Sequence, residues 1–372
     1  MNVLHSNKLK GKKVGIVFGT FAPMHLGHYH NIVRAKREND ACIVIVSGYE
    51  GDRGDEIGLD VLKRFRYTRE LFKDDENVYV DMIDETYIPR YPSGWDEWLD
   101  MAYEIYNNAT QEYMIRTWYV GEEDYKKELK DRTIDNVVLL DRNILNISAT
   151  DIRDNPLKHW SYITRPFRRH FSFNILVTGS ASNGKTTLVR DLARTLGSPF
   201  TDEYARRYEE ESNVRDEELV ANDFHYLASG QFKNNKEAIM SPANNGIFIA
   251  DTDVLTTKCY SKVYLSKEEH EKLVPIYDLM ASKQKWDLIL FMPPTTEYVD
   301  DGFRDMSHSD DEFRWKMTDM MLQELKDNGL GDKIKVVESE ETICDKNGYY
   351  DKFEKSLSII KNEILKKYGI TL

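Results

Sequence analysis

The sequence predicts an α/β protein made of two doubly wound parallel-sheet domains in tandem. Short apolar runs alternate with segments of helical periodicity, which is typical of parallel strands joined by crossover helices. The alternation stops between Asp154 and Phe171 and then begins again. A chain of 372 residues is also longer than one hydrophobic core usually organises, so two domains are the expected arrangement.

The first half of the chain contains five apolar runs that predict strands. We expect strands at 13–19, 41–48, 78–84, 115–121 and 136–141, with helices from about His25, at 59–72 and at 95–106. The stretch DNPLKHWSYITRPFRRHF then interrupts the pattern with two prolines and several basic and aromatic side chains. Because such composition is typical of a boundary, we place a first domain at 1–155 and a linker at 156–171.

The second half repeats the alternation, so the second domain is placed at 172–372. We expect strands at 173–179, 246–253, 287–294 and 333–339, and helices around 311–325 and 359–369. In open α/β sheets, ligands bind at the carboxyl ends of the strands where the topology switches. The loops that follow these strands are therefore where functional residues are expected.

The composition excludes several classes of protein. A net charge of −13 and a pI near 5.3 argue against nucleic-acid binding, which depends on lysine and arginine. We find no apolar run long enough to cross a bilayer, so we expect no membrane insertion and a cytoplasmic location. Cys42, Cys259 and Cys344 lack CxxC spacing, which predicts buried or free thiols rather than disulfides or zinc ligands.

The segment GSASNGKTT matches the phosphate-binding loop pattern G-x-x-x-x-G-K-[ST] directly after a predicted strand. Its glycines let backbone N–H groups surround nucleotide phosphates, and Lys185 can reach the β and γ phosphates. The hydroxyl of Thr186 can bind Mg²⁺. The residues we assign to ATP and phosphate binding here are Gly179, Asn183, Gly184, Lys185, Thr186 and Thr187.

Charged residues after later strands complete the expected kinase site. Asp251 ends a strand and is predicted to hold Mg²⁺ with Thr186, while Arg304 is predicted to act on the transferring phosphoryl group from a mobile loop. Acidic residues at strand ends and charged residues in loops are common in proteins. We assign Asp251 and Arg304 to the kinase site because the same domain contains a phosphate-binding loop. No NKxD element of GTPases is present, which favours a small-molecule kinase.

The first domain carries the pattern G-x-F-x-P-x-H-x-G-H from Gly19 to His28. A metal site is one reading of His25 and His28, but no carboxylate or cysteine ligand lies nearby in the sequence. Imidazole donors at a helix N-terminus favour phosphate binding and nucleotidyl transfer instead. The residues assigned to ATP or phosphate binding in this domain are Gly19, Thr20, Phe21, Ser148, Thr150 and Arg153, although Ser148 or Thr150 alone could be a helix cap.

The paired motifs H-x-G-H and I-S-x-T-x-x-R resemble those of nicotinamide mononucleotide (NMN) adenylyltransferases. With a P-loop kinase domain after them, the chain resembles the NadR-type bifunctional NMN adenylyltransferase and ribosylnicotinamide kinase family. Further matches are IPRYPSGWDEW, ISATDIR, EYAR, DTD and VDDGFR, so that the resemblance spans about residues 13 to 365.

The resemblance implies a Rossmann-like nucleotidyltransferase domain followed by a P-loop kinase domain. The kinase would phosphorylate nicotinamide riboside with ATP and Mg²⁺, and the first domain would join NMN to AMP from ATP, giving NAD and pyrophosphate. It further implies that Trp95 stacks on the nicotinamide ring and that Glu203 and Tyr204 hold the riboside. Asp251 or Asp253 would lie near the 5′-hydroxyl, and which acid is the base stays open.

Two alternatives remain at this level. The chain could be another adenylyltransferase and kinase pair, such as that of coenzyme A synthesis, although the segment SGWDEW argues against it. It could also be a sensor of NAD or ATP with one inactive domain and a functional link to a nicotinamide riboside transporter. Some enterobacterial family members carry an N-terminal helix-turn-helix domain, whereas only twelve residues precede the first strand here, so we expect no DNA binding. We also expect a homo-oligomer.

Overall fold

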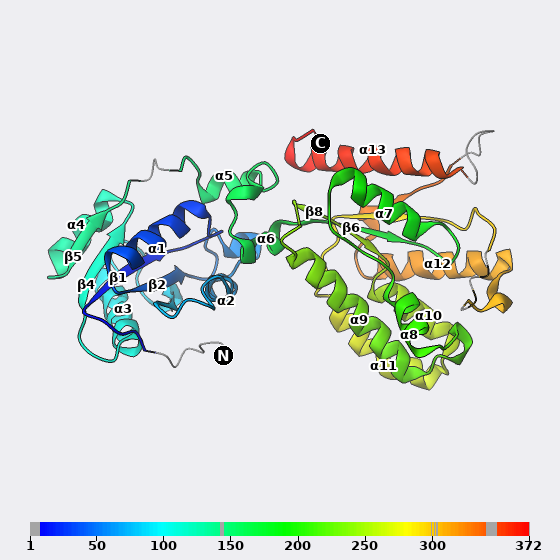
Figure 1. The fold of residues 1–372 in the computed structure, drawn as a ribbon, viewed down its shortest axis with the longest axis horizontal. Helices are drawn as coiled ribbons and strands as arrows, with labels where there is room; N and C mark the ends of the chain where they lie inside the picture. Colours follow the sequence, from blue (N-terminus) through cyan, green and yellow to red (C-terminus); the bar gives the residue numbers. More distant parts are fainter. Residues whose placement is uncertain are drawn as a thin grey trace. The chain divides into compact units, whose positions relative to one another are not determined.

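The computed structural model describes residues 8–141, 145–298, 300, 302, 304–339 and 348–371. It divides into two compact units, Met1–Phe171 and Ser172–Leu372 (Figure 1). Cys344, expected to be a free or buried thiol, lies outside the described residues, as do Asp301 and Phe303 of the VDDGFR motif. The thiols of Cys42 and Cys259 are buried.

The first unit contains a five-stranded parallel sheet in the order β3-β2-β1-β4-β5. Its strands are β1 (Lys13–Gly19), β2 (Ala41–Gly48), β3 (Val78–Asp84), β4 (Ile115–Val120) and β5 (Asn136–Leu139). Its helices are α1 (Leu26–Glu38), α2 (Val61–Leu71), α3 (Trp95–Ala109), α4 (Glu123–Arg132), α5 (Ala149–Asp154) and α6 (Arg165–Phe171). The strand order reverses between β1 and β4, so the loops after these strands are where a ligand site is expected.

Two apolar cores cover the two faces of this sheet. One includes side chains of α3 and α4, such as Leu99 and Leu129. The other includes side chains of α1 and α6, such as Ile32 and Phe167. The segment 156–171, which the sequence suggested as a linker, contributes Trp160, Ile163, Phe167 and Phe171 to this second core. The structure therefore assigns it to the first unit, because four of its apolar side chains are buried there.

The second unit is also built on a five-stranded parallel sheet, in the order β10-β9-β6-β8-β7, which confirms the predicted α/β class. Its strands are β6 (Phe173–Thr178), β7 (Phe200–Thr201), β8 (Ile247–Asp251), β9 (Leu288–Phe291) and β10 (Ile334–Val336). The helices are α7 (Lys185–Leu196), α8 (Tyr204–Ser212), α9 (Ala221–Met240), α10 (Val254–Tyr264), α11 (Lys267–Ala281), α12 (Asp311–Asp327) and α13 (Tyr349–Tyr368).

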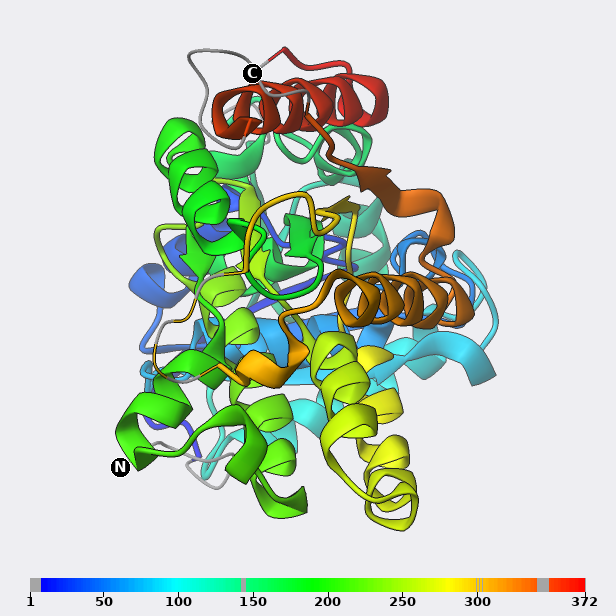
Figure 2. The same ribbon diagram turned by 90° about the vertical axis from the view of Figure 1, so that its right-hand side faces the viewer.

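Helices lie on both sides of this second sheet. The C-terminal helix α13, drawn in red, lies beside α7 (Figures 1 and 2). Helices α9, α10 and α11 pack against one another, and α12 packs against α10. Among the helices of the described chain, none is both long and apolar enough to cross a membrane.

A buried ion pair fixes the loop between β2 and α2. Arg64 donates from Nη2 to Oδ2 of Asp52 at 2.7 Å and from Nη1 to Oδ1 at 3.1 Å. A Cβ atom on Gly48 or Gly54 would lie 2.1 or 2.2 Å from a guanidinium nitrogen of Arg64, so only glycine fits at these positions. Burial alone would raise the pKa of Asp52, but hydrogen bonds from Arg64 and from the loop backbone lower it overall. The pair therefore determines the path of the loop.

Substituting Asp52→Asn tests the contribution of this ion pair to stability. The change leaves the Arg64 guanidinium buried without a counter-charge, which should lower the free energy of unfolding of the first unit by about 3–5 kcal/mol. Urea unfolding followed by tryptophan fluorescence measures this, since four of the six tryptophans lie in that unit. Glu50→Gln, an exposed change in the same loop, is the matched control and should leave the midpoint unchanged. Equal midpoints for both variants would contradict the assignment.

Candidate active sites

A cavity of about 860 Å³ lies at the carboxyl ends of β1 and β4 in the first unit. It is lined by segments that are far apart in the sequence: the loop after β1, the start of α1, the start of α3 and the start of α5. The sequence-predicted residues that line it are Gly19, Thr20, Phe21, His25, His28, Trp95, Ser148 and Thr150. The fold thus brings together both motifs of the first unit around one cavity.

The two motif histidines form the N-terminal cap of α1. The backbone N–H of Gly27 donates to Nδ1 of His25 at 3.1 Å, and the backbone N–H of His25 donates to Nδ1 of His28 at 3.4 Å. The rings stack with their centroids 3.8 Å apart. An Nδ1 that accepts a hydrogen bond carries no proton, so the neutral ring keeps its proton on Nε2. Both histidines therefore act as caps whose Nε2–H groups are donors.

The second motif of the first unit is linked to the first through Arg153. Its guanidinium donates to the carbonyl oxygen of Ala22 at 2.6 Å and to Oγ1 of Thr150 at 2.9 Å. Ser148 is the N-cap of α5 and accepts a hydrogen bond from the backbone N–H of Asp151. Arg153 was predicted to bind phosphate, but it is absent from the cavity lining. In this structure it holds the two motifs together.

Arg53 was not recognised from the sequence, yet it lines the same cavity. It lies in the loop after β2 and donates to Oγ1 of Thr20 at 3.2 Å. The neighbouring Asp52 carries the ion pair with Arg64 that fixes this loop. The sequence feature that could have identified Arg53 is the segment GYEGDRGDEIG. This segment is a glycine-rich loop that contains an arginine and directly follows a buried strand.

An aromatic wall closes one side of the first cavity. Trp95 is 6% exposed and lies edge-on to Phe18 and Trp98, with ring centroids 6.1 and 5.5 Å away. Its Nε1–H is buried and makes no hydrogen bond within the described part of the chain. By contrast, Nε1–H of Trp98 donates to Oγ of Ser47 at 2.9 Å. Trp95 therefore presents an indole to the cavity, while its role in stacking stays a prediction.

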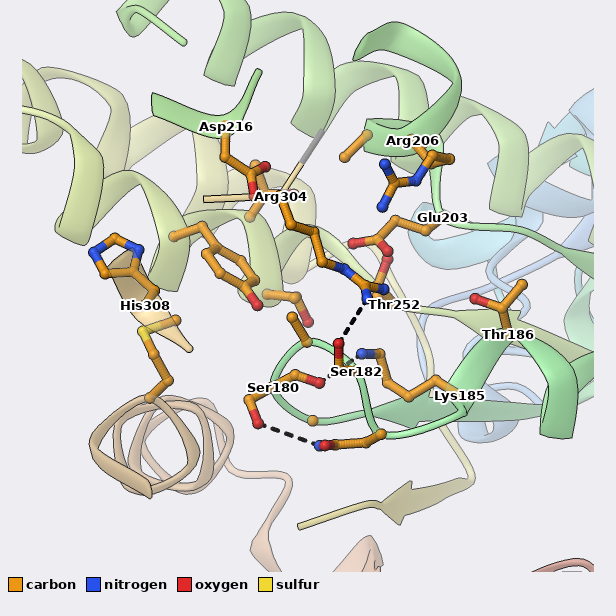
Figure 3. A pocket seen from close by; sticks show the side chains of 18 of the residues that line it. Ser180, Ser182, Lys185, Thr186, Glu203, Arg206, Asp216, Thr252, Arg304 and His308 are labelled. Atoms are coloured by element: carbon orange, nitrogen blue, oxygen red, sulfur yellow. Dashed lines mark hydrogen bonds between the residues drawn. The ribbon is translucent and has the colours of Figure 1, made fainter. Parts of the chain in front are cut away.

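The second unit contains a cavity of about 240 Å³ around the phosphate-binding loop (Figure 3). The sequence-predicted residues that line it are Gly179, Asn183, Gly184, Lys185, Thr186, Thr187, Glu203 and Arg304. The Lys185 ammonium donates to the carbonyl oxygen of Ser180 at 2.8 Å. Gly179 has φ 142°, and a Cβ there would lie 2.1 Å from the carbonyl oxygen of Met292. The loop geometry therefore requires glycine at this position.

Thr186 and Asp251 are in direct contact beside this loop. Oγ1 of Thr186 donates to Oδ2 of Asp251 at 2.5 Å, whereas Oδ1 of Asp251 is buried and has no hydrogen-bond partner among the described residues. Burial and the charge of Glu203 raise the pKa of Asp251 to about 7. A hydroxyl next to a carboxylate with an unsatisfied oxygen is a donor set that fits Mg²⁺, which prefers oxygen ligands.

Two arginines reach the phosphate-binding loop from the segment that precedes and begins α12. Nη1 of Arg304 donates to Oγ of Ser182 at 2.6 Å, as Figure 3 shows, and Nη2 of Arg314 donates to Oδ1 of Asn183 at 3.1 Å. Arg314 is 3% exposed and lines the cavity, but the sequence reasoning missed it. Arg314 lies on the same face of α12 as the buried Met317 and Met321. A charged residue on such an apolar helix face was the sequence feature that could have identified it as functional.

Two residues predicted for the substrate lie elsewhere. Asp253 is 1% exposed, is absent from the cavity lining, and caps α10 by accepting from the backbone N–H groups of Leu255 and Thr256. Its other oxygen accepts from Nε1–H of Trp286 at 3.2 Å. Tyr204 is also absent from the lining, because its ring packs against Gly230 of α9. Neither side chain lines the cavity in this structure, and a substrate role for either stays a prediction.

Comparison with protein families gives a separate match for each unit. Residues 16–155 match the cytidylyltransferase-like family, and residues 174–341 match the family described as AAA domain. Each match covers the sheet and the motif of one unit. The order of the two families along the chain agrees with the predicted order of a nucleotidyltransferase domain and a P-loop domain.

Comparison with whole proteins gives matches over nearly the full chain. The trifunctional NAD biosynthesis/regulator protein NadR of Salmonella typhimurium is 30% identical over 86% of this chain and 78% of its own length. A crystal structure of a NadR protein in complex with NR is 41% identical, with a TM-score of 0.87 over 98% of this chain and 99% of the other. A second NadR structure, in complex with NAD and AMP-PNP, is 40% identical, with a TM-score of 0.84 over 98% of each chain. Because this chain is 30% identical to a NadR protein over 86% of its length and shares its fold with NadR structures over 98% of its length, the chain belongs to the NadR family.

Proposed function

We propose that this chain is a bifunctional enzyme of NAD salvage. The second unit transfers the γ-phosphoryl group of ATP to the 5′-hydroxyl of nicotinamide riboside, giving NMN and ADP. The first unit then transfers AMP from another ATP to the phosphate of NMN, giving NAD and pyrophosphate. The main support for this proposal is that one chain contains two cavities lined by phosphate-binding motifs. In the same family, one crystal structure contains NR and another contains NAD and AMP-PNP.

In the adenylyl transfer, an oxygen of the NMN phosphate attacks the α-phosphorus of ATP and the bond to pyrophosphate breaks. The protein needs to align the two phosphates and to stabilise negative charge on the transferring and leaving groups. The Nε2–H donors of His25 and His28 at the N-terminus of α1 are placed for this. Arg53 supplies a guanidinium from the facing loop.

In the kinase reaction, the hydroxyl oxygen of the riboside attacks the γ-phosphorus and ADP leaves. We propose that the Lys185 ammonium exchanges its bond with the Ser180 carbonyl oxygen for bonds with phosphate oxygens. Arg304 and Arg314, already at the loop, stabilise the charge on the transferring group. Thr186 and Asp251 would hold Mg²⁺, which supplies charge neutralisation at the β and γ phosphates when bound.

Glu203 is the best placed general base for the acceptor hydroxyl. It lies at the N-cap of α8, lines the cavity, and is close enough to Asp251 to raise the pKa of that carboxyl group. Asp251 is engaged by Thr186, and Asp253 is occupied as a helix cap. Among the three acids that the motifs offer, Glu203 therefore remains for the proton.

The activities are expected to use soluble small molecules only: nicotinamide riboside, NMN, ATP and NAD. ATP as the donor in both steps supports a cytoplasmic location, which we propose together with the absence of nucleic-acid partners. A homo-oligomeric state and a functional link to a riboside transporter stay predictions.

The first test is a time course with the protein, MgATP and nicotinamide riboside in which NMN, NAD, ADP and pyrophosphate are separated by chromatography. NMN and ADP should appear first, with NAD and pyrophosphate following after a lag. NMN that accumulates with ADP while no NAD forms would instead favour the sensor alternative for the first unit. Formation of neither NMN nor NAD would overturn the proposal.

The variants His28→Ala and Lys185→Ala should separate the two activities. His28→Ala removes a donor at the developing charge, so adenylyl transfer should fall by about 100-fold to 1,000-fold while ADP formation from the riboside continues. Lys185→Ala should reduce riboside phosphorylation to a similar extent and leave the conversion of added NMN to NAD intact. Each variant is the control for the other. If either substitution affected both activities or neither, the site assignment would be wrong.

Glu203→Gln tests the general base. The substitution keeps the size of the side chain but removes the proton acceptor, so kcat for riboside phosphorylation should fall by about 100-fold or more. Asp253→Asn is the comparison, because it weakens the cap of α10 and should lower the melting temperature without a comparable loss of kcat. A greater loss of kcat in Asp253→Asn than in Glu203→Gln would reverse the assignment.

A further inference from the structure

One residue of the kinase cavity has a backbone conformation that its own side chain disfavours. Thr252 directly follows β8 and has φ 68°, which lies in the left-handed region. A Cβ atom makes this region unfavourable, and a β-branched side chain there is an outlier. The other non-glycine residues with positive φ in the described chain are not β-branched: Phe21, Ser182 and Asn213. The conformation of Thr252 therefore lowers stability, and the surrounding fold must hold it in place.

Contacts on both sides of Thr252 impose this conformation. Its backbone N–H donates to the carbonyl oxygen of Val177 in β6 at 3.1 Å, which continues the sheet beyond the end of β8. The preceding Asp251 is bonded to Thr186, and the following Asp253 is the N-cap of α10. The backbone between β8 and α10 is thus fixed at three successive residues. Strain that is held in this way is typical of functional sites.

The side chain of Thr252 is presented to the cavity. It lines this cavity together with Glu203, Lys185 and Arg304, as Figure 3 shows. Thr252 is 3% exposed, and within the described part of the chain its hydroxyl group has no hydrogen-bond partner. Buried polar groups in proteins are normally paired. A nearly buried hydroxyl that lines a cavity without a protein partner is therefore a donor for a bound molecule.

Thr252 is next to both parts of the proposed phosphoryl-transfer site. Its neighbour Asp251 contacts Thr186 at the start of α7, where the phosphates are expected. The charge of Glu203, the proposed base, also acts on Asp251, so Glu203 lies close to the same strand end. The group in transit passes between the phosphate donors and the acceptor hydroxyl. A hydroxyl donor at this strand end is placed to contact it.

We propose that Thr252 is a further catalytic residue of the kinase reaction, whose Oγ1–H donates a hydrogen bond to an oxygen of the transferring phosphoryl group. This rests on the proposed kinase function. The acceptor oxygen forms a bond to the γ-phosphorus as the bond to ADP breaks, and the acceptor proton goes to Glu203. Thr252 keeps its own proton and forms no covalent bond. Its strained backbone fixes the hydroxyl before the substrates bind, so that little reorganisation is needed during transfer.

Thr252→Val tests the hydroxyl group, because valine keeps the shape and the β-branch of threonine. With MgATP and nicotinamide riboside, kcat for ADP formation should fall by about 10-fold to 100-fold, the size of one hydrogen bond to a charged group. KM for both substrates should stay close to the wild-type values, because the contact is made during transfer. Thr252→Ser restores the hydroxyl without the methyl group and should recover most of the lost kcat.

The first unit supplies an internal control for these variants. Conversion of added NMN to NAD and pyrophosphate uses the other cavity, so it should proceed at the wild-type rate in Thr252→Val and in Thr252→Ser. The melting temperature of Thr252→Val should also stay close to that of the wild type, because the positive φ and the side-chain volume are unchanged.

Thr252→Gly and Thr252→Ala measure the strain separately from the chemistry. Both variants lack the hydroxyl, so both should lose kcat as Thr252→Val does. Only alanine keeps a Cβ atom in the left-handed region, so the glycine variant should melt at a temperature higher by about 2 °C or more. Asn213→Gly and Asn213→Ala are the matched control, since Asn213 has positive φ at the C-cap of α8 and does not line the cavity. They should show the same order of melting temperatures with wild-type kcat.

The outcomes separate the role of Thr252 from the kinase function itself. If the wild type forms no ADP from the riboside, the proposed function is overturned and the catalytic role of Thr252 with it. If the wild type is active and Thr252→Val keeps its kcat, or loses activity only through a higher KM, the kinase function stands and the role of Thr252 is wrong. A Thr252→Ser variant as slow as Thr252→Val would also overturn it. Equal melting temperatures of Thr252→Gly and Thr252→Ala would contradict the strain on which the proposal rests.

Discussion

Phosphate oxygens need hydrogen-bond donors, and a parallel sheet followed by helices supplies them at one edge. In each unit a strand ends, the chain turns, and a helix begins with backbone N–H groups that have no partner within the helix. Helix α1 follows β1 in this way and α7 follows β6. The two units differ in nearly every side chain, yet both place their motif at this structural position. In the second unit the site is arranged around these backbone donors, whereas in the first unit His25 and His28 cap the start of α1 and present their own Nε2–H groups.

Around these donors, each unit adds charge from loops that the fold brings close. In the first unit, the ion pair of Asp52 and Arg64 fixes the loop that carries Arg53 to Thr20. In the second unit, Arg314 reaches the phosphate-binding loop from a helix more than a hundred residues later in the chain. Arg314 is held by a buried contact, and Arg53 lies in a loop that a buried ion pair fixes, so the site is largely formed before a nucleotide binds. Preorganisation of this kind is what electrostatic stabilisation of a transition state requires.

The sequence predicted the parts of this structure that have a local signal. Buried strands and the two motifs were recognisable because period and spacing are properties of neighbouring residues. Strand β7 was missed because two residues carry no period. The capping role of Asp253 was not predicted, because a motif shows which residues follow a strand and not the direction in which their side chains point. The packing of Tyr204 was not predicted, because Gly230, which receives its ring, lies 26 positions away in α9.

The cap of α1 has a consequence for how such proteins can change over evolutionary time. His25 and His28 satisfy the first backbone groups of the helix with one ring nitrogen and present the other as a donor. A lineage that no longer required the first activity could not lose these histidines freely, because the helix would lose its cap with them. Conserved histidines in a relative would therefore be weak grounds for inferring that the activity persists. An inactive descendant could keep both histidines for as long as they capped this helix.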